Sequence, residues 1–330
     1  MLSNNKPYIA VAPMMDWTDR HCRYFMRLLA PNIELYTEMV TTDAILHGDR
    51  DRLLAYDAAE HPLVLQLGGS DPTSLAQCAK IAEDYQYDAV NLNVGCPSDR
   101  VQRGKIGACL MLEPELVAES VAAMRDTVHM PVTVKTRIGV DECDSYEQLK
   151  HFVQCIADVG CEHVILHARK AWLKGLSPKQ NREVPPIRYD VVNKIKQDFP
   201  QLKITINGEI KTVDQAKTLL DHVDGVMIGR EAYHNPFLLA ELQQTFYTPD
   251  DNALTRQAVI ERFIPYMQTQ LDRGVYLKHM TRHILGLFQG LPGARAWRRK
   301  LSEGAHLPGA DVTLLLNAMN CLTDTCSGRS

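Results

Sequence analysis

The sequence contains no apolar run that approaches the ~20 residues of a transmembrane helix, which excludes a protein that crosses a bilayer by helices. Its start lacks a charged stretch followed by a long apolar one, so we expect no secretory signal. The nine cysteines are odd in number and widely spaced, with no Cys-x-x-Cys pair. This usage indicates reduced thiols in a cytoplasmic protein rather than a disulfide framework or a zinc site, and we expect no metal.

Two nucleotide-binding signatures are also missing. No Gly-x-Gly-x-x-Gly follows the first predicted strand, and no Gly-x-x-x-x-Gly-Lys occurs anywhere. What is present is a chain of 330 residues that is 45% hydrophobic and 23% charged, which is ordinary for a globular protein with a full core. The length predicts one large domain and a smaller one, and we expect a monomer.

Short apolar, β-branched segments alternate with helical patterns over the first 230 residues. Eight strands are predicted, at 8–13, 33–37, 62–67, 88–93, 132–136, 163–167, 203–207 and 224–228. The helices between them include 73–85, 114–128, 145–158 and 212–221, with starts marked by Asp71-Pro72, Glu113-Pro114 and Thr212. Eight such units predict an α/β fold, a (β/α)8 TIM barrel, whose active site lies at the carboxyl ends of the strands.

After residue 245 the sequence predicts helices only, at about 255–272, 275–289, 292–302 and 311–322. We therefore expect a barrel domain over 1–245 and an all-helical domain over 246–330. Residues 251–330 carry ten basic and six acidic side chains, a net charge of +4, whereas the first 250 residues carry −8. A basic appendage on an acidic body indicates a polyanionic partner, and an ordinary solvated surface is the alternative.

Nearly every predicted strand has an apolar body and ends in a polar or special residue. These are Pro13, Met14, Met15, Gln66, Asn93, Cys96, Lys135, His167, Asn207, Gly208, Glu209, Gly229 and Arg230. The last two strands end in glycines, where backbone N–H groups can approach a ligand, and Arg230 opens a helix. Barrels commonly bind phosphate after strands seven and eight, so we expect a phosphate site there; two ordinary tight turns are the alternative.

The side chains at the other strand ends suit several reactions. Lys135 can form a Schiff base or act as a fixed positive charge, for instance beside a reduced flavin. The amides of Gln66 and Asn93 match the edge of a flavin or a pyrimidine, and His167 can donate to phosphate or be structural. Cys96, in a turn at the chemical face, suits a proton donor, whereas a nucleophilic role requires a partner that stabilises its thiolate.

Seven segments, in order over residues 8–237, resemble the tRNA-dihydrouridine synthases: APMMDWTD, LVLQLGG, VNLNVGCPSDRVQRGKIGACLM, VTVKTRIG, ILHAR, INGEI and VMIGR. The long connection at 168–189 resembles that of their subfamily A. This resemblance implies bound FMN, NADPH as reductant, and reduction of the uracil 5,6 double bond at positions 20 and 20a of the tRNA D-loop.

The resemblance also implies residue roles. Pro13, Met14 and Met15 lie along the flavin, Gln66, Lys135 and His167 bind it, and Asn207, Gly208, Glu209, Gly229 and Arg230 hold its phosphate. Cys96 is the proton donor, and Asn93 lies near the target uridine. We expect the RNA to contact Lys179 and Arg182 in the 168–189 loop, and Arg295 and Arg298, which share one face of a predicted helix with Arg299. Trp297 is expected to anchor that helix to its own domain.

Three rival classes remain at this point. A small-molecule flavin enzyme, such as a dihydroorotate dehydrogenase, shares the barrel but has no need of a basic helical appendage. A Schiff-base aldolase would use Lys135 covalently and be colourless. A non-catalytic RNA-binding protein has no need of polar groups at every strand end.

Overall fold

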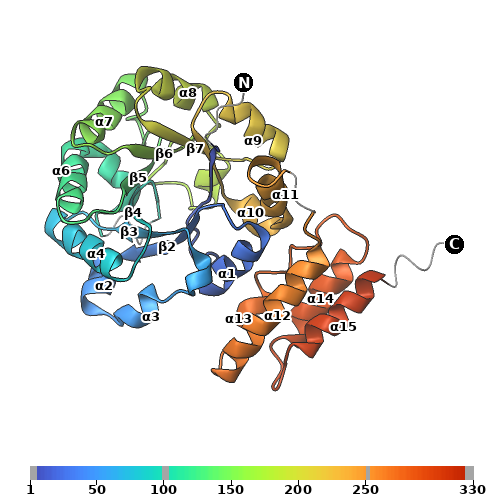
Figure 1. Cartoon of the computed structure of the whole chain (residues 1–330). Coiled ribbons are helices and arrows are strands. Elements are labelled where there is room, and N and C mark those ends of the chain that lie inside the picture. The colour runs from blue at the N-terminus through green and yellow to red at the C-terminus, as the bar shows by residue number, and fades with distance from the viewer. Residues whose placement is uncertain (1–5, 99–103, 250–252, 324–330) are drawn as a thin grey trace. The chain divides into compact units, whose positions relative to one another are not determined.

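The computed structural model describes residues 6–98, 104–249 and 253–323, which form two compact units (Figure 1). The first unit contains residues 6–16 and 34–229, and the second contains residues 17–33 and those from 230 onward. This division differs from the predicted boundary at residue 245, because residues 17–33 and 230–245 group with the C-terminal helices. The separation into a catalytic and an RNA-binding domain stays a prediction.

Within the described residues, the first unit contains eight parallel strands in the order β1-β8-β7-β6-β5-β4-β3-β2. They are β1 (Tyr8–Val11), β2 (Leu35–Thr41), β3 (Leu63–Gly68), β4 (Ala89–Val94), β5 (Val132–Arg137), β6 (His163–His167), β7 (Lys203–Asn207) and β8 (Gly225–Ile228). A parallel bridge between Ala10 and Glu34 closes the ring, and the Val11 N–H donates to the Glu34 carbonyl at 2.9 Å. The predicted α/β barrel is confirmed.

The helices of the first unit follow the strands in sequence. They are α2 (Thr42–His47), α3 (Arg50–Leu54), α4 (Pro72–Asp84), α6 (Pro114–Arg125), α7 (Tyr146–Asp158), α8 (Tyr189–Asp198) and α9 (Val213–Leu220), with 3-10 turns η1 (Ala58–Glu60), η2 (Gly107–Leu112) and η3 (Gln180–Arg182). Local chemistry fixes their starts. The Asp71 carboxylate accepts from the Ser74 N–H at 2.8 Å, and Ser145 and Gln148 form a capping box.

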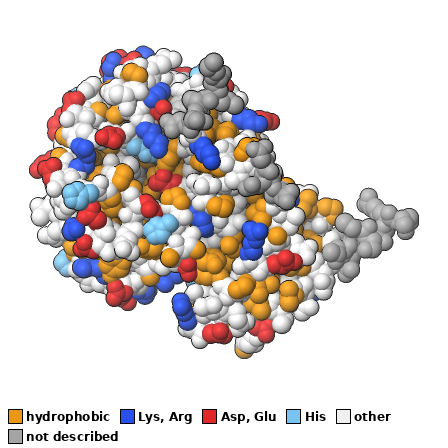
Figure 2. Space-filling view, viewed as in Figure 1, with side chains coloured by type: hydrophobic (Ala, Val, Ile, Leu, Met, Phe, Trp, Pro, Cys, Tyr) orange, Lys and Arg blue, Asp and Glu red, His pale blue; other side chains and the backbone are white. Residues whose placement is uncertain are grey.

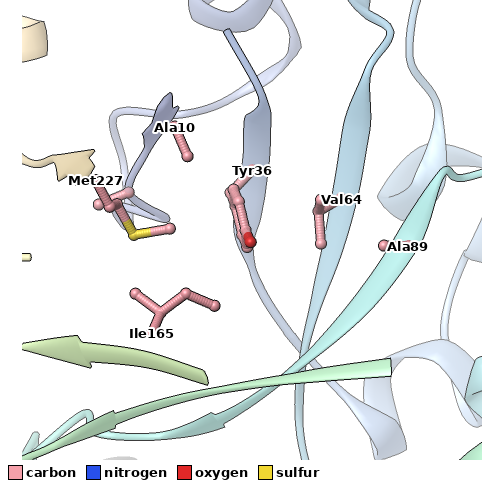
Figure 3. Packing of buried hydrophobic residues seen from close by; sticks show 7 residues of the cluster. Ala10, Tyr36, Val64, Ala89, Ile165 and Met227 are labelled. Atoms are coloured by element: carbon pink, nitrogen blue, oxygen red, sulfur yellow. The ribbon is translucent and has the colours of Figure 1, made fainter. Parts of the chain in front are cut away.

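The barrel interior is filled by side chains and is not a pore. Its cluster of buried residues is Ala10, Ala12, Tyr36, Val64, Ala89, Ile165 and Met227. Figure 3 shows side chains of this cluster pointing toward one another between the strands. Because such side chains fill the interior of a small barrel, we look for the chemistry at the strand ends.

The second unit contains α1 (Arg20–Leu29), α10 (Arg230–His234), α11 (Phe237–Phe246), α12 (Arg256–Asp272), α13 (Lys278–Thr281), α14 (Ala294–Gly304) and α15 (Thr313–Thr323). Asp19 caps α1 by accepting from the N–H groups of His21 and Cys22, both at 3.0 Å, and its other oxygen lies 3.0 Å from Nε2 of the buried His283. On α1, the Tyr24 ring stacks on Tyr266 of α12 at 3.8 Å. These contacts explain why α1 groups with the C-terminal helices.

The predicted helix over 275–289 was wrong, because only Lys278–Thr281 is helical and the chain continues in turns. Side chains from other segments donate hydrogen bonds to backbone carbonyls that would accept from backbone N–H groups in a continuous helix. The Trp297 indole donates to the Ile284 carbonyl at 3.2 Å, and Arg256 Nε donates to the Leu287 carbonyl at 2.9 Å. The fully buried Trp297 thereby anchors α14, as predicted.

In the part of the chain that the structure describes, no helix combines the length and apolarity needed to cross a membrane.

Candidate active site

The loop after β4 presents Cys96 in a fixed turn. The Asn93 Oδ1 accepts from the backbone N–H groups of Gly95 and Cys96, both at 3.0 Å, and the Cys96 carbonyl accepts from the Ala108 N–H at 2.9 Å. The thiol itself is half-buried, with Sγ 3.5 Å from Ser98 Oγ. A thiol held in this way keeps one position at the mouth of the barrel while it remains reachable from solvent.

A chain of amides supports that turn from below. Asn93 Nδ2 donates to Gln66 Oε1, Gln66 Nε2 donates to Asn91 Oδ1, and Asn91 Nδ2 donates to Thr133 Oγ1, each at 2.8 Å. Gln66 and Asn93 are both buried, so these bonds are shielded from water. Each carboxamide carries a second N–H. The two predicted site residues therefore orient each other and retain one donor each for a ligand.

Lys135, at the end of β5, reaches toward β7. Its Nζ donates to Asn207 Oδ1 at 3.2 Å, and Asn207 Nδ2 donates to the Met227 carbonyl at 2.7 Å. Burial, followed by the charge of Arg137, lowers the pKa of Lys135 to about 7, and the nearby Cys96 sulfur opposes that shift. An anion beside the ammonium would restore its charge.

Cations crowd around His167 at the end of β6. Burial and then the charges of Arg137, Lys135, Arg169 and Arg182 hold the pKa of His167 well below its usual range. The imidazole is therefore neutral at physiological pH. On the face that Figure 2 shows, Lys and Arg side chains of the first unit are interspersed with Asp and Glu, whereas the groups acting on His167 are of one sign. Such a cluster favours an anionic ligand.

The loop after β7 brings backbone close to that cluster. Gly208 has φ of +130°, and a Cβ there would come within 2.9 Å of Ile187 and 3.1 Å of the His167 ring, so only glycine fits. Glu209, at φ +51°, pairs with Arg169 at 2.7 Å. The buried Nε of Arg169 has no partner among the described residues. A buried guanidinium N–H without a partner is a donor that an anionic ligand could use.

Arg137 joins the loops around the mouth. Its Nε donates to the Gly95 carbonyl at 2.9 Å, and its Nη1 donates to the carbonyls of Lys170 at 3.0 Å and Asn181 at 2.9 Å. Asn181 is fully buried and shapes the 168–189 loop, because its side chain bonds the N–H and the carbonyl of Trp172 at 2.7 and 2.8 Å. The loops after β4, β5 and β6 are thus one hydrogen-bonded rim.

The structure brings most predicted residues of the barrel together. Gln66, Asn93, Cys96, Lys135, His167, Asn207, Gly208 and Glu209 are connected by the contacts above, and a Cβ on Gly229 would approach Asn207 Nδ2 only to 3.8 Å. Pro13 and Met14 are half-buried after β1, and Met15 is exposed. Lys179 and Arg182 are exposed at η3. The second unit contains Arg230, at the start of α10, and Arg295 and Arg298, which are exposed on α14.

Sequence reasoning missed three residues of this site, Arg137, Arg169 and Asn181. Arg137 ends β5, and its position two residues after Lys135 was the available signal. Arg169 and Asn181 lie beyond the end of β6, in a connection whose shape no strand or helix pattern specifies.

A family model described as dihydrouridine synthase matches residues 10–323 of this chain. A tRNA-dihydrouridine(20/20a) synthase of Shewanella oneidensis is 60% identical over 306 residues, which cover 93% of this chain and 91% of that protein. One of Escherichia coli strain K12 is 58% identical over 316 residues, covering 96% and 91%. Among solved structures, an old yellow enzyme homologue from Zymomonas mobilis matches with a TM-score of 0.52 at 12% identity, covering 77% of this chain and 92% of that one, which is a likeness of fold.

Proposed function

Since this chain belongs to the dihydrouridine synthase family and is an oxidoreductase acting on a CH–CH bond, we propose that it reduces uridine to 5,6-dihydrouridine at positions 20 and 20a of the tRNA D-loop. The observation that carries the proposal is the thiol of Cys96, which the Asn93 turn fixes beside the cluster of cationic side chains at the strand ends. The reaction takes place in the cytoplasm, where tRNA is found.

The pocket has the chemistry that FMN requires. Cations around His167, the unpartnered Nε of Arg169 and the open backbone at Gly229 suit a phosphate and an electron-rich ring system. We assign FMN to Pro13, Met14, Met15, Gln66, Lys135 and His167, and its phosphate to Asn207, Gly208, Glu209 and Gly229. Glu209 contributes through its backbone, because its carboxylate is already paired with Arg169. A phosphate contact from Arg230 stays a prediction.

FMN held by these residues would supply, after reduction by NADPH, the hydride that C6 of the uracil accepts. The Cys96 thiol gives its proton to C5, and the resulting thiolate recovers a proton from solvent, so one hydride and one proton together saturate the double bond. Asn93 holds the backbone on the N-terminal side of the thiol, and the Ala108 N–H holds the Cys96 carbonyl on the other side, so together they set its direction. Lys135 places positive charge in the pocket, which stabilises negative charge on the reduced ring system.

The substrate base must leave its stack to reach this pocket, at a cost of a few kcal/mol. The exposed Lys179 and Arg182 lie on the same loop that Asn181 and Arg137 fix to the barrel rim, so they can position the RNA backbone near the thiol. Further backbone contacts are assigned to Arg295 and Arg298 on α14.

The direct test incubates the purified full chain with unmodified tRNA transcript and NADPH, then locates dihydrouridine by mass spectrometry of nuclease fragments. We expect a yellow protein that releases FMN on heating and forms dihydrouridine at positions 20 and 20a. A colourless protein, or a yellow one that reduces free pyrimidines and leaves tRNA unchanged, would overturn the proposal. NADH replaces NADPH in a parallel reaction, and equal rates would reject the assigned reductant.

A further inference from the structure

Three side chains with metal-binding atoms converge on helices α6 and α7, outside the strand-end site. Glu115 lies in the first turn of α6, and His151 and Cys155 are four residues apart on one face of α7. One ligand atom from each lies within 4.8 Å of the other two. Glu115 and His151 are exposed and Cys155 is half-buried, so an ion can reach all three from solvent.

Two of the three separations are close to those around a tetrahedral ion. His151 Nε2 lies 3.3 Å from Glu115 Oε1 and 3.7 Å from Cys155 Sγ. Zinc bond lengths of about 2.0–2.1 Å to nitrogen and oxygen and about 2.3 Å to sulfur put tetrahedral neighbours about 3.3–3.6 Å apart. The sulfur is also 3.8 Å from Nδ1, so it lies beside the ring and not in line with the Nε2 lone pair, and the exposed imidazole has to turn for both residues to bind one ion.

We propose that Glu115, His151 and Cys155 bind one zinc ion that links α6 to α7, with water as the fourth ligand. The donor set selects the metal, because thiolate and imidazole prefer Zn²⁺ whereas Mg²⁺ and Ca²⁺ take oxygen ligands. The thiol proton passes to solvent when the ion binds. The absence of Cys-x-x-Cys pointed away from zinc, but here 36 residues separate the carboxylate on one helix from the imidazole on the next.

A recess of about 150 Å³ beside the cluster is lined by His151, Gln148 and Phe152, and by neither Glu115 nor Cys155. The open coordination position therefore faces solvent, to which Glu115 and His151 are exposed. Cys143 lines the same recess, yet its sulfur is outside the group of three converging atoms. Cys143 is therefore the matched control for a thiol that is near the site and is not a ligand.

The test titrates the full flavin-loaded chain with Co²⁺ and records the red part of the visible spectrum, where flavin does not absorb. One equivalent should give the intense d–d bands of tetrahedral cobalt there, and a difference spectrum against the cobalt-free protein should show sulfur-to-cobalt charge transfer in the near ultraviolet; Zn²⁺ should abolish both. Cys155→Ser, His151→Ala and Glu115→Gln should each weaken binding at least about tenfold, since even outer partners of a metal site contribute that much. Cys143→Ser should bind as the unaltered chain does.

Two further measurements do not depend on how well the variants fold. In the unaltered chain, Zn²⁺ should slow alkylation of Cys155, followed by peptide mass spectrometry, without slowing that of Cys143. Zn²⁺ should also raise Tm, because an ion bound only by the folded state stabilises it. An octahedral cobalt spectrum without sulfur bands, binding that survives Cys155→Ser, or unchanged alkylation of Cys155 would each overturn the proposal.

Discussion

At the scale of single residues, the Cys96 thiol owes its place to an amide and not to a base. Asn93 directs the turn, and Sγ lies 3.5 Å from Ser98 Oγ. A thiol can give up its proton without a neighbouring base, and the charge of Lys135, which interacts with this sulfur, stabilises the thiolate that is left. We expect Cys96→Ala to keep FMN and to accept hydride from NADPH, but to form dihydrouridine roughly 10²–10⁴-fold more slowly.

Single-turnover measurements separate those two half-reactions. Cys109 is the matched control, since it lies on η2 with its sulfur 3.2 Å from the Ile106 carbonyl, and burial raises the pKa of its thiol. Cys109→Ala should therefore leave turnover close to normal. Near-normal dihydrouridine formation by Cys96→Ala would reject the assignment of Cys96 as the acid.

The proposed contact of Lys135 with FMN predicts that cofactor binding depends on pH. Because burial lowers its pKa to about 7 in the protein without ligand, the side chain loses its proton as pH rises above 7, and an anionic ligand must then recruit that proton. FMN affinity should fall between pH 7 and 9, by at most about tenfold per pH unit. His167 stays neutral over this range, because its pKa is held well below the usual value.

Flavin fluorescence quenching on protein stripped of FMN measures this affinity. Lys135→Arg should bind FMN with little dependence on pH, and Lys135→Met should bind weakly at every pH and lower the flavin reduction potential. If Lys135→Met shows the same pH slope as the unaltered protein, another group titrates and the placement of Lys135 is wrong.

The sequence predicted which residues lie at strand ends, because strand ends converge in a barrel whatever the loops do, and their roles stay predictions. It assigned Gln66 and Asn93 only to ligands, whereas one hydrogen bond joins them to each other and their others go to Asn91 and to the turn at Cys96. Arg137 was missed for a related reason. Arg137 donates to backbone carbonyls of two other loops, and the positions of carbonyl groups cannot be predicted from the identities of the residues that carry them.

At the scale of elements, α1 shows how one buried imidazole makes the second unit sensitive to acid. Burial lowers the pKa of His21 to about 4, although the charge of Asp19 acts in the opposite direction, and the ring Nδ1 lies 2.7 Å from Tyr266 Oη. A histidine with a depressed folded pKa binds its proton first in the unfolded chain. Its stabilising contribution is therefore complete above about pH 6.5 and is lost as pH falls toward 4.

The free energy of urea unfolding should accordingly decrease between pH 6.5 and pH 4, with His21 contributing up to about 3 kcal/mol of the change. His21→Gln keeps a hydrogen-bonding group toward Tyr266 without a titrating ring, so its pH dependence should be smaller. His306→Gln, an exposed control on the same unit, should match the unaltered chain. An identical acid response in His21→Gln would exclude this histidine as the cause.

Element prediction succeeded where the local signal and the tertiary context agree. Strands such as 163–167 and 203–207 match β6 and β7 residue for residue, and Pro or an N-cap marks α4, α6 and α9. The segment 275–289 failed because Trp297 and Arg256, distant in sequence, compete for its carbonyls. The helix propensity of residues 275–289 contains no information about these hydrogen bonds from other segments.

At the scale of the whole molecule, the proposed RNA contacts on α14 can be tested without knowing how the two units are arranged. Arg295, Arg298 and Arg299 are exposed on one helix, and like charges on one face favour a polyanion that neutralises them. Replacing Arg295 and Arg298 with Ala should weaken tRNA binding and reduce the slope of log K against log salt by about one to two.

FMN content and NADPH oxidation without tRNA should be unchanged in that double variant, because α14 belongs to the second unit and the flavin residues assigned above belong to the first. Filter binding over a series of salt concentrations gives the slope. Lys278→Ala with Arg273→Ala removes two charges elsewhere in the same unit and serves as the control. A slope that changes equally in both double variants would mean that α14 has no special role.

The guanidinium of Arg137 also limits which loop sequences this barrel can accept as relatives diverge. One side chain donates hydrogen bonds to carbonyls in the loops after β4 and β6. A change in the backbone of one of these loops therefore affects the position of the other. A loop transplanted after β6 from a relative with another preferred nucleotide would have to supply carbonyls at the same two places, or the thiol of Cys96 would shift with it. If the loop after β6 selects the nucleotide and Cys96 delivers the proton, as proposed, the two functions are inherited together and a new specificity requires matched changes in both loops.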